Sequence, residues 1–236
     1  MQASHYVLGY ENLLNSNLFL KLEAYYQHLY NIPVEDKLGS LYSLINQDDY
    51  FVDKALVNDG EGKNIGLELT LERYLSNQYY FLFTTSLYDS KYKAKNGSWK
   101  NSRYNGNYVG NFLFGKEFKV GRKNSHDKTI GINSRITFLG GRRYTSINLE
   151  ESIKQEKQVE KEGQYLGNKA DDVLFLNIAI NYRVNKQKLS HEVKLDIQNL
   201  TNNNTAIDYY YNTVTKEIDE IPQLSMFPVV SYTVHF

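Results

Sequence analysis

The sequence predicts an all-β fold: an antiparallel, up-and-down meander of about nine strands that forms part of a larger transmembrane β-barrel. The first observation is a period of two, because apolar and polar side chains alternate along most of the chain, as they do on the two faces of a strand. The second is that short polar turns alternate with long connections, an arrangement typical of outer-membrane barrels. The third is that charged residues such as Glu192 and Lys194 occupy the polar parity in mid-strand, which indicates a wet lumen.

Composition narrows the function classes. The chain has 236 residues, enough for one large β domain, and we treat residues 1–236 as a single unit. Its 27 basic and 27 acidic residues give a formal net charge of +0, so nothing in the overall charge favours nucleic-acid binding. No run approaches the ~18 apolar residues of a membrane helix. A content of 21 Tyr and 11 Phe with only 3 Pro favours long strands.

Four strands are predicted in the first half of the chain, at residues 5–11, 17–27, 64–72 and 79–87. Leu20 and Leu22 illustrate the apolar parity of the second strand, and Lys21 and Glu23 lie on the opposite parity. Short polar turns at 15–17 and 76–78 close two hairpins. Residues 31–62, which include Pro33 and three glycines, are predicted to form a long irregular connection.

Five more strands are predicted at residues 108–119, 130–138, 174–184, 189–198 and 226–236. Residues 121–127 and 185–188 are predicted to be short turns, whereas residues 90–107, 140–171 and 201–223 are long connections. Within the second of these, residues 153–162 are dense in charge, and we expect a solvated loop there rather than a helix.

The last predicted strand ends on an aromatic residue. An odd number of strands, with the last one descending to the periplasm, would place Met1 outside the cell, and bacterial single-chain barrels have even strand numbers. We therefore expect the chain to be the C-terminal part of a longer barrel, with a signal peptide and upstream strands missing.

A soluble antiparallel sandwich is the main alternative fold, because it also buries one face of each sheet and wets the other. Strands of about ten residues favour the membrane, since that is the length with which a strand tilted by ~45° crosses a bilayer. A β-sandwich lectin remains open at this point.

Several stretches together resemble the β-barrel of TonB-dependent outer-membrane receptors of the Bacteroidetes type. They are residues 61–72 (EGKNIGLELTLE), 79–81 (YYF), 86–92 (SLYDSKY), 103–108 (RYNGNY), 115–118 (GKEF), 140–145 (GGRRYT) and 196–202 (DIQNLTN), followed by the terminal aromatic strand. The resemblance covers nearly the whole chain. Each stretch is a weak signal, and it is the set that is specific.

The resemblance implies a barrel of about 22 strands in the bacterial outer membrane, plugged by an N-terminal domain that this chain lacks. It implies active uptake of a large nutrient such as a siderophore, cobalamin, a peptide or an oligosaccharide. The implied partners are outer-membrane lipid and lipopolysaccharide, the TonB complex acting through the missing N-terminal part, the barrel assembly machinery, and a surface lipoprotein. Val230, Tyr232, Val234 and Phe236 would be read by that assembly machinery. A surface adhesion barrel and a passive porin without energy coupling are the alternatives.

Candidate ligand contacts lie in or near the predicted outer loops, where binding residues concentrate on rigid scaffolds. Aromatic and cationic side chains there suit stacking on rings and pairing with anions. The candidates are Trp99, Arg103, Tyr104, Arg142 and Arg143. For the two neighbouring arginines, pairing with Glu150 and Glu151 is the simpler alternative. For the run Tyr209–Tyr211, an aromatic girdle at the membrane interface is the preferred interpretation.

Enzymatic and metal chemistry are not predicted. The sequence has no nucleophile elbow and no phosphate-binding glycine pattern. Its histidines (His5, His28, His126, His191 and His235) have no metal-ligand spacing, and there is no cysteine. We therefore expect no catalytic residue, no metal and no cofactor.

Overall fold

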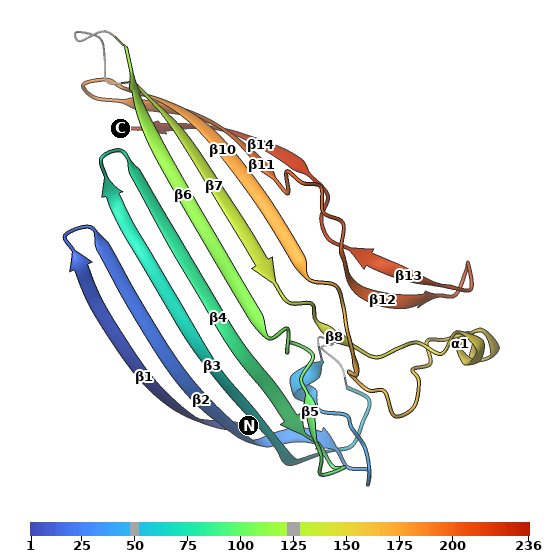
Figure 1. Ribbon diagram of the computed structural model, residues 1–236. Helices are drawn as coiled ribbons and strands as arrows, with labels where there is room; N and C mark the ends of the chain where they lie inside the picture. The colour runs from blue at the N-terminus through green and yellow to red at the C-terminus, as the bar shows by residue number, and fades with distance from the viewer. Residues whose placement is uncertain (48–51, 122–127) are drawn as a thin grey trace.

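The computed structural model describes residues 1–47, 52–121 and 128–236, and over these residues the chain is an all-β protein built on one ten-stranded antiparallel sheet (Figure 1). Nine long strands follow one another across the sheet in chain order, and one short strand pairs beside them. The long strands are β1 (Gln2–Asn15), β2 (Leu18–Glu35), β3 (Leu56–Ser76), β4 (Tyr79–Lys93), β6 (Tyr108–Val120), β7 (Lys128–Leu139), β10 (Val173–Asn185), β11 (Ser190–Gln198) and β14 (Phe227–His235).

The nine predicted strands and their up-and-down order are therefore confirmed, and the short strand β5 (Trp99–Asn101), which pairs with β4, was not predicted. The predicted connection over residues 31–62 is wrong at both ends, because β2 runs on to Glu35 and β3 already begins at Leu56. Irregularities in the β2–β3 register on either side of Ile32 let the ladder continue around Pro33. Glycine is needed at position 60, because a Cβ there would clash with Val34 Cγ1 at 2.5 Å. The predicted turn at 121–127 lies outside the described residues apart from Gly121.

The sheet is open. β1 and β14 are its two edges, and within the described residues they do not pair with each other, so this chain forms a curved wall rather than a closed barrel. Both edge strands are exposed along nearly their whole length. Their unpaired backbone groups are available for neighbouring strands.

The pairing register places the apolar parity of all strands on one face, which we call the apolar face. One row of directly paired residues crosses six strands and contains only aliphatic and aromatic side chains: Leu20, Leu71, Phe83, Phe112, Ile136 and Leu176. The neighbouring row on the opposite face, which we call the polar face, contains Lys21, Thr70, Thr84, Asn111 and Thr137. The alternation read from the sequence thus becomes two chemically distinct surfaces.

No second layer covers the apolar face in the described part of the chain, where the other two sheets have only two strands each. Leu67 is 60% exposed and Val230 is 72% exposed. The buried hydrophobic cluster lies instead at the loop end, where Val34, Tyr92, Ala94 and Leu166 pack together. A sandwich would bury one face of the sheet, so the described residues do not form one.

Short turns close the sheet at one end, and long loops with small elements of their own extend from the other (Figure 1). These elements are η1 (Leu44–Asn46), β8 (Arg143–Tyr144), α1 (Leu149–Gln155), β9 (Asn168–Lys169), β12 (Ala206–Asn212) and β13 (Glu217–Pro222). No described helix is long and apolar enough to span a membrane.

The prediction of a loop over 153–162 is wrong at its start, because α1 runs through Ile153 to Gln155. The helix begins earlier than the charge-dense stretch. Its cap is Asn148, whose side chain accepts a hydrogen bond from the backbone N–H of Glu151 at 3.3 Å. Glu151 then forms an ion pair with Lys154 at 2.8 Å one turn later.

Candidate functional site

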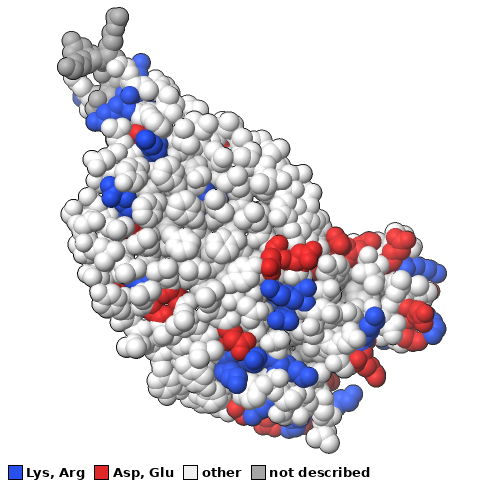
Figure 2. All heavy atoms as spheres, viewed as in Figure 1, with Lys and Arg blue, Asp and Glu red and all other residues white. Residues whose placement is uncertain are grey.

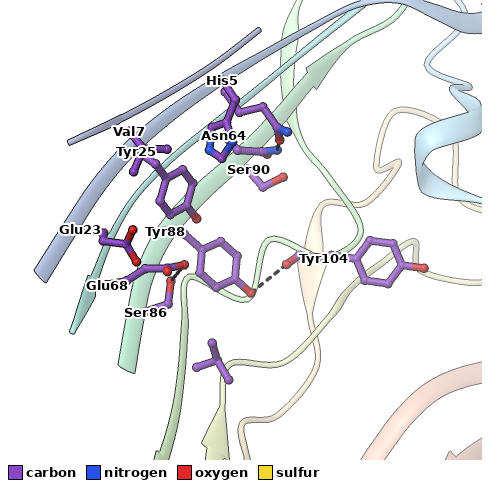
Figure 3. Close-up of a pocket in the computed structure, with 12 residues that line it drawn as sticks. His5, Val7, Glu23, Tyr25, Asn64, Glu68, Ser86, Tyr88, Ser90 and Tyr104 are labelled. Carbon is purple, nitrogen blue, oxygen red and sulfur yellow. Dashed lines mark hydrogen bonds between the residues drawn. The ribbon is translucent and has the colours of Figure 1, made fainter. Parts of the chain in front are cut away.

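A cavity of about 550 Å³ opens on the polar face, toward the loop end of β1–β4, and we call it the polar pocket (Figure 3). Hydroxyl, amide and carboxylate groups line it together with tyrosine rings. The lining residues are His5, Val7, Glu23, Tyr25, Gln27, Asn64, Glu68, Ser86, Tyr88, Ser90, Tyr104 and Val109.

The strand register assembles this pocket from residues far apart in sequence. Gln27 pairs with Asn64, and Asn64 pairs with Ser90, so three polar residues lie in one row across β2, β3 and β4. Glu23, Glu68 and Ser86 form a second row in the same way. The rows alternate with side chains on the apolar face, which is why all of these polar groups project on the same side of the sheet.

Gly66 shapes the floor between those two rows. A Cβ at Gly66 would lie 2.6 Å from the hydroxyl oxygen of Tyr25, so the absence of a side chain lets the tyrosine ring lie flat over the backbone. Tyr25 is paired with Gly66, and Gly66 with Tyr88. The pocket therefore presents two aromatic rings across a smooth floor.

Hydrogen bonds hold the lining groups in place. Asn64 Nδ2 donates to Gln27 Oε1 at 2.7 Å, and the Ser86 hydroxyl donates to Glu68 Oε1 at 3.4 Å. The Tyr88 hydroxyl donates to the carbonyl oxygen of Tyr104 at 3.0 Å, which ties the β4–β6 loop to the wall of the pocket.

The charge in the polar pocket is negative. Glu23 is neutralised by Lys21 Nζ at 2.9 Å, whereas Glu68 accepts only the serine hydroxyl among the bonds given above. None of the described lining residues is Lys or Arg. Carboxylates, amides and tyrosine hydroxyls next to aromatic rings suit a ligand with many hydroxyl or amine donors, and they disfavour an anionic one.

The polar face beyond this pocket is occupied by side chains that bond to one another. The Tyr80 hydroxyl donates to Asn133 Oδ1 at 2.9 Å, and Asn133 Nδ2 donates to Asn181 Oδ1 at 3.2 Å. The three hydrogen-bonded side chains lie over Gly115 and Gly131. A Cβ at Gly115 would lie 2.2 Å from Tyr80 Cε1, and one at Gly131 would lie 2.2 Å from Asn181 Oδ1. These side chains form a polar wall whose members are linked by hydrogen bonds.

Four of the five predicted ligand contacts lie together in the long loops at one end of the sheet. The Arg142 guanidinium lies 5.3 Å from the ring centre of Tyr104, and the backbone N–H of Arg143 donates to the carbonyl of Arg103 at 2.8 Å. Arg143 Nε also donates to the carbonyl of Asn105 at 3.3 Å. Of the two alternative partners predicted for the arginines, Glu150 and Glu151, Glu151 forms an ion pair with Lys154 at 2.8 Å.

Arg103 is built into the contacts between the loops. Its backbone N–H donates to Asn46 Oδ1 at 3.0 Å, and its guanidinium lies 4.0 Å from a carboxylate oxygen of Asp208. Arg142 and Tyr104 are the exposed members of the group, and Arg103 and Arg143 are half-buried. The Tyr104 ring points away from the other residues labelled in Figure 3, so this residue contributes its carbonyl rather than its ring to the polar pocket.

Trp99 lies apart from the other four predicted contacts. Two lysine ammonium groups lie over its ring: Lys63 Nζ is 4.3 Å and Lys93 Nζ is 5.5 Å from the ring centre. Lys63 and Lys93 share the residue parity of Ile65 and Leu87, so the indole belongs to the loop end of the apolar face.

The loops pack on each other through buried polar contacts (Figure 2 shows the charged side chains gathered over them). Gln47 Nε2 donates to the Tyr165 hydroxyl at 3.0 Å, and burial raises the pKa of Tyr165 to about 12. Burial also raises the pKa of the nearby Glu160 carboxyl; Arg103 opposes this shift and Asp208 adds to it.

Asp172 holds the start of β10 to the loop between β7 and β8. It accepts hydrogen bonds from the Tyr108 hydroxyl at 2.5 Å and from the Gly141 backbone N–H at 3.1 Å, and it pairs with Lys169 Nζ at 3.0 Å. The Tyr108 hydrogen bond and the lysine lower the pKa of Asp172 to about 2.

Gly140 and Gly141 serve close packing of backbones rather than unusual backbone angles. A Cβ at Gly140 would lie 1.8 Å from the carbonyl oxygen of Gly106, and one at Gly141 would lie 1.9 Å from the carbonyl oxygen of Ala170. Neither glycine has a positive φ. Glycine is needed at these two positions because three loop segments touch there.

The tyrosine run lies in the β12–β13 hairpin, away from the main sheet. Tyr209 packs on Tyr144 with ring centres 4.7 Å apart, and the backbone N–H of the buried Tyr211 donates to Gln158 Oε1 at 3.1 Å. The run therefore joins the hairpin to the segment around α1, whereas the preferred prediction placed it in an interfacial girdle.

The four residues predicted as an assembly signal lie on one side of the edge strand β14 and just beyond it. Val230 pairs with Leu195, Tyr232 with Val193 and Val234 with His191, so these three belong to the apolar face. Phe236 follows the end of β14 and is fully exposed.

Most residues of the polar pocket were not predicted. Glu23, Asn64 and Glu68 appear in the sequence only as members of the polar parity. The pairing register between neighbouring strands brings them together. That register depends on where each long loop ends and the next strand begins. Parity shows which residues share a face, but not which share a row.

Comparison with known proteins identifies no relative: no protein-family model matches the chain, and no curated protein matches it in sequence. Within residues 1–47, 52–121 and 128–236, no three His, Cys, Asp or Glu side chains gather where they could hold a metal ion. His126, one of the five histidines considered in the sequence, lies outside these ranges.

Proposed function

We propose that this chain is part of the wall of an outer-membrane transport barrel that takes up a large nutrient ligand, as the resemblance to TonB-dependent receptors implies. In this proposal the apolar face contacts lipid and the polar face lines the lumen. The short turns lie at the periplasm, and the long loops face the outside.

One observation carries the proposal: a single-layer sheet of nine long strands exposes a continuous apolar face, and the polar face lies on its other side. In water an apolar surface of that extent is unfavourable unless another surface covers it. A bilayer covers it, and the two open edges would pair with further strands, because backbone groups in lipid must be satisfied.

The polar pocket narrows the ligand class. Its carboxylates, amides and tyrosines favour a neutral or cationic ligand rich in hydroxyl or amine donors, such as an oligosaccharide or a peptide. An anionic ligand would meet Glu68 without a Lys or Arg in the described lining.

The first experiment asks whether the protein is an integral barrel. We expect the intact protein to sediment with the outer membrane and to resist extraction by salt and alkaline carbonate. Its electrophoretic mobility should change on boiling. Release by salt alone would contradict the proposal and would favour a soluble lectin.

The second experiment separates gated transport from a passive pore and from an adhesin. In a planar bilayer the intact protein should be electrically silent when a plug fills the lumen, whereas a porin conducts constitutively. Cells lacking the protein should lose uptake of the ligand as well as its surface binding. Loss of surface binding with unchanged uptake would favour adhesion.

A third test addresses the ligand class. Purified protein is screened for binding against neutral, cationic and anionic small molecules. Binders that are lost in Glu68→Gln or Tyr25→Ala variants should be neutral or cationic, and Tyr80→Phe on the polar wall is the matched control. A set of pocket-dependent binders that are all anionic would contradict the assignment.

A further inference from the structure

A second concave surface lies on the opposite side of the same strands, on the apolar face at the loop end of β1–β4, and we call it the apolar groove. Its volume is about 700 Å³, within the range of ligand pockets. The small side chain of Ala24 leaves its floor low, and larger side chains form its walls. Those walls are built mainly by Tyr6, Leu8, Tyr26, Ile65, Leu67 and Leu87.

The walls come from two adjacent rows of the register. Leu8, Ala24, Leu67 and Leu87 form the row nearer the middle of the sheet, and Tyr6, Tyr26, Ile65 and Asp89 form the next row toward the loops. The rings of Tyr6 and Tyr26 stack with centres 6.5 Å apart. Aromatic residues at this level are typical of the boundary between hydrocarbon and headgroups.

A row of basic residues, two of them lysines, follows directly beyond the groove. His28, Lys63 and Lys91 pair across β2, β3 and β4, two residues farther toward the loops than the Tyr26–Ile65–Asp89 row. Two residues of strand correspond to about 7 Å. The ammonium groups therefore lie about one headgroup beyond the aromatic boundary, on the same face as the groove.

The partners of these cations leave a net positive charge. Lys91 Nζ pairs with Asp89 at 3.0 Å, and Lys93 Nζ pairs with Glu61 at 2.5 Å in the row beyond. Lys63 Nζ instead lies 4.3 Å from the ring centre of Trp99, a contact that holds the ammonium in place without neutralising it. Three lysines thus face two carboxylates.

We propose that the groove and the lysine row form one binding site for an acyl lipid that carries a phosphate group, with an acyl chain in the groove and the phosphate at Lys63 and Lys91. The proposal rests on the proposed function, because it requires the apolar face to contact a bilayer. The chemistry matches in two parts: apolar walls bury the chain, and ammonium groups donate charge-assisted hydrogen bonds to phosphate oxygens. It also gives the isolated Trp99 a role, that of positioning Lys63.

The test uses the intact protein in detergent, with bound lipid counted by native mass spectrometry. Phosphatidic acid and diacylglycerol with identical acyl chains are offered as probes, so the pair differs only in the phosphate. We expect the protein to prefer phosphatidic acid by about tenfold or more, the factor that one charge-assisted hydrogen bond provides.

Two variants and two matched controls locate the site. The double variant Lys63→Gln and Lys91→Gln should abolish the preference, whereas Lys116→Gln, on the same face near the turns, should leave it intact. Ala24→Phe should fill the groove floor and reduce binding of both probes, whereas Leu22→Phe, two residues along the same strand and face, should not.

Equal binding of the two probes, or a preference that survives the double lysine variant, would overturn the phosphate site. Undiminished binding in Ala24→Phe, with its fold confirmed by circular dichroism, would overturn the groove. Salt and carbonate extraction of the membranes from which the protein is purified separates the barrel proposal from the lipid-site proposal. A protein that resists extraction but shows no lipid preference retains the barrel and loses only this site.

Discussion

Replacing Leu195 with Arg tests the assignment of the two faces most directly. Leu195 lies in β11, and its row across the sheet runs through Ile132, Ile180 and Val230. Ile180 is near the middle of the apolar stretch of β10, so Leu195 lies near the middle of the apolar face. Leu195 is 40% exposed, so its side chain is not enclosed by the rest of the described chain.

The expected cost follows from what covers that face. If it is lipid, an arginine near the midplane of a barrel strand costs about 2–4 kcal/mol of folding free energy. If it is water, a polar substitution at a partly exposed strand position costs within about 0.5 kcal/mol. The two readings differ by several times the error of a titration.

The assay is reversible urea unfolding of the intact protein in lipid vesicles. Lys194→Gln is the control, because Lys194 lies next to Leu195 in the chain but on the polar face, where it pairs with Asp196 at 3.0 Å. Losing this partly exposed pair should cost no more than about 1 kcal/mol. Equal costs for the two variants would refute the assignment of the faces.

Three further predictions concern the long loops. Gly140→Ala should destabilise the protein by about 1–3 kcal/mol in thermal unfolding, because its Cβ would meet a backbone carbonyl; Gly9→Ala, whose Cβ would make ordinary contacts at 3.7 Å, should be tolerated, and equal melting temperatures would contradict the packing argument. The pKa of Asp172 is lowered from 3.8 to about 2, so its stabilisation is present above about pH 4 and lost as the pH falls through 2. Asp172→Asn should therefore speed hydrogen exchange at the Gly141 amide at neutral pH, and unchanged exchange would contradict that role. The pKa of Glu160 is raised, so the ionised carboxylate opposes folding as the pH rises through that value. Glu160→Gln should raise the melting temperature more at pH 7 than at pH 4, and the reverse order would count against burial as the cause.

Parity was predictable from the sequence, and the extent of the strands was not. Apolar and polar side chains alternate strongly enough along β3 and β10 that their faces follow directly. At Pro33 the same reasoning failed, because proline and glycine usually mark turns. Here they lie at irregularities of a continuing ladder, and only the tertiary contact between Gly60 and Val34 shows why.

The candidate site was likewise predictable only in part. Local chemistry pointed to Arg103, Tyr104, Arg142 and Arg143, and the structure brings these residues together. It also shows that Arg103 and Arg143 are used inside the loops, which composition alone does not distinguish from ligand contact. The polar pocket required the register of four strands, which no local pattern contains.

The loop contacts bear on how a ligand would be captured. Leu166, from the β9 loop, packs on Tyr92 and Val34, which belong to the extended ends of β4 and β2. The Tyr92 hydroxyl also donates to the carbonyl of Leu41 at 2.9 Å, so the β2–β3 loop is fixed to the same cluster. Loops with a buried core of their own lose little further conformational entropy on binding. On this side of the wall, capture would therefore rely on a preformed surface, and affinity would depend on matched groups more than on loop closure.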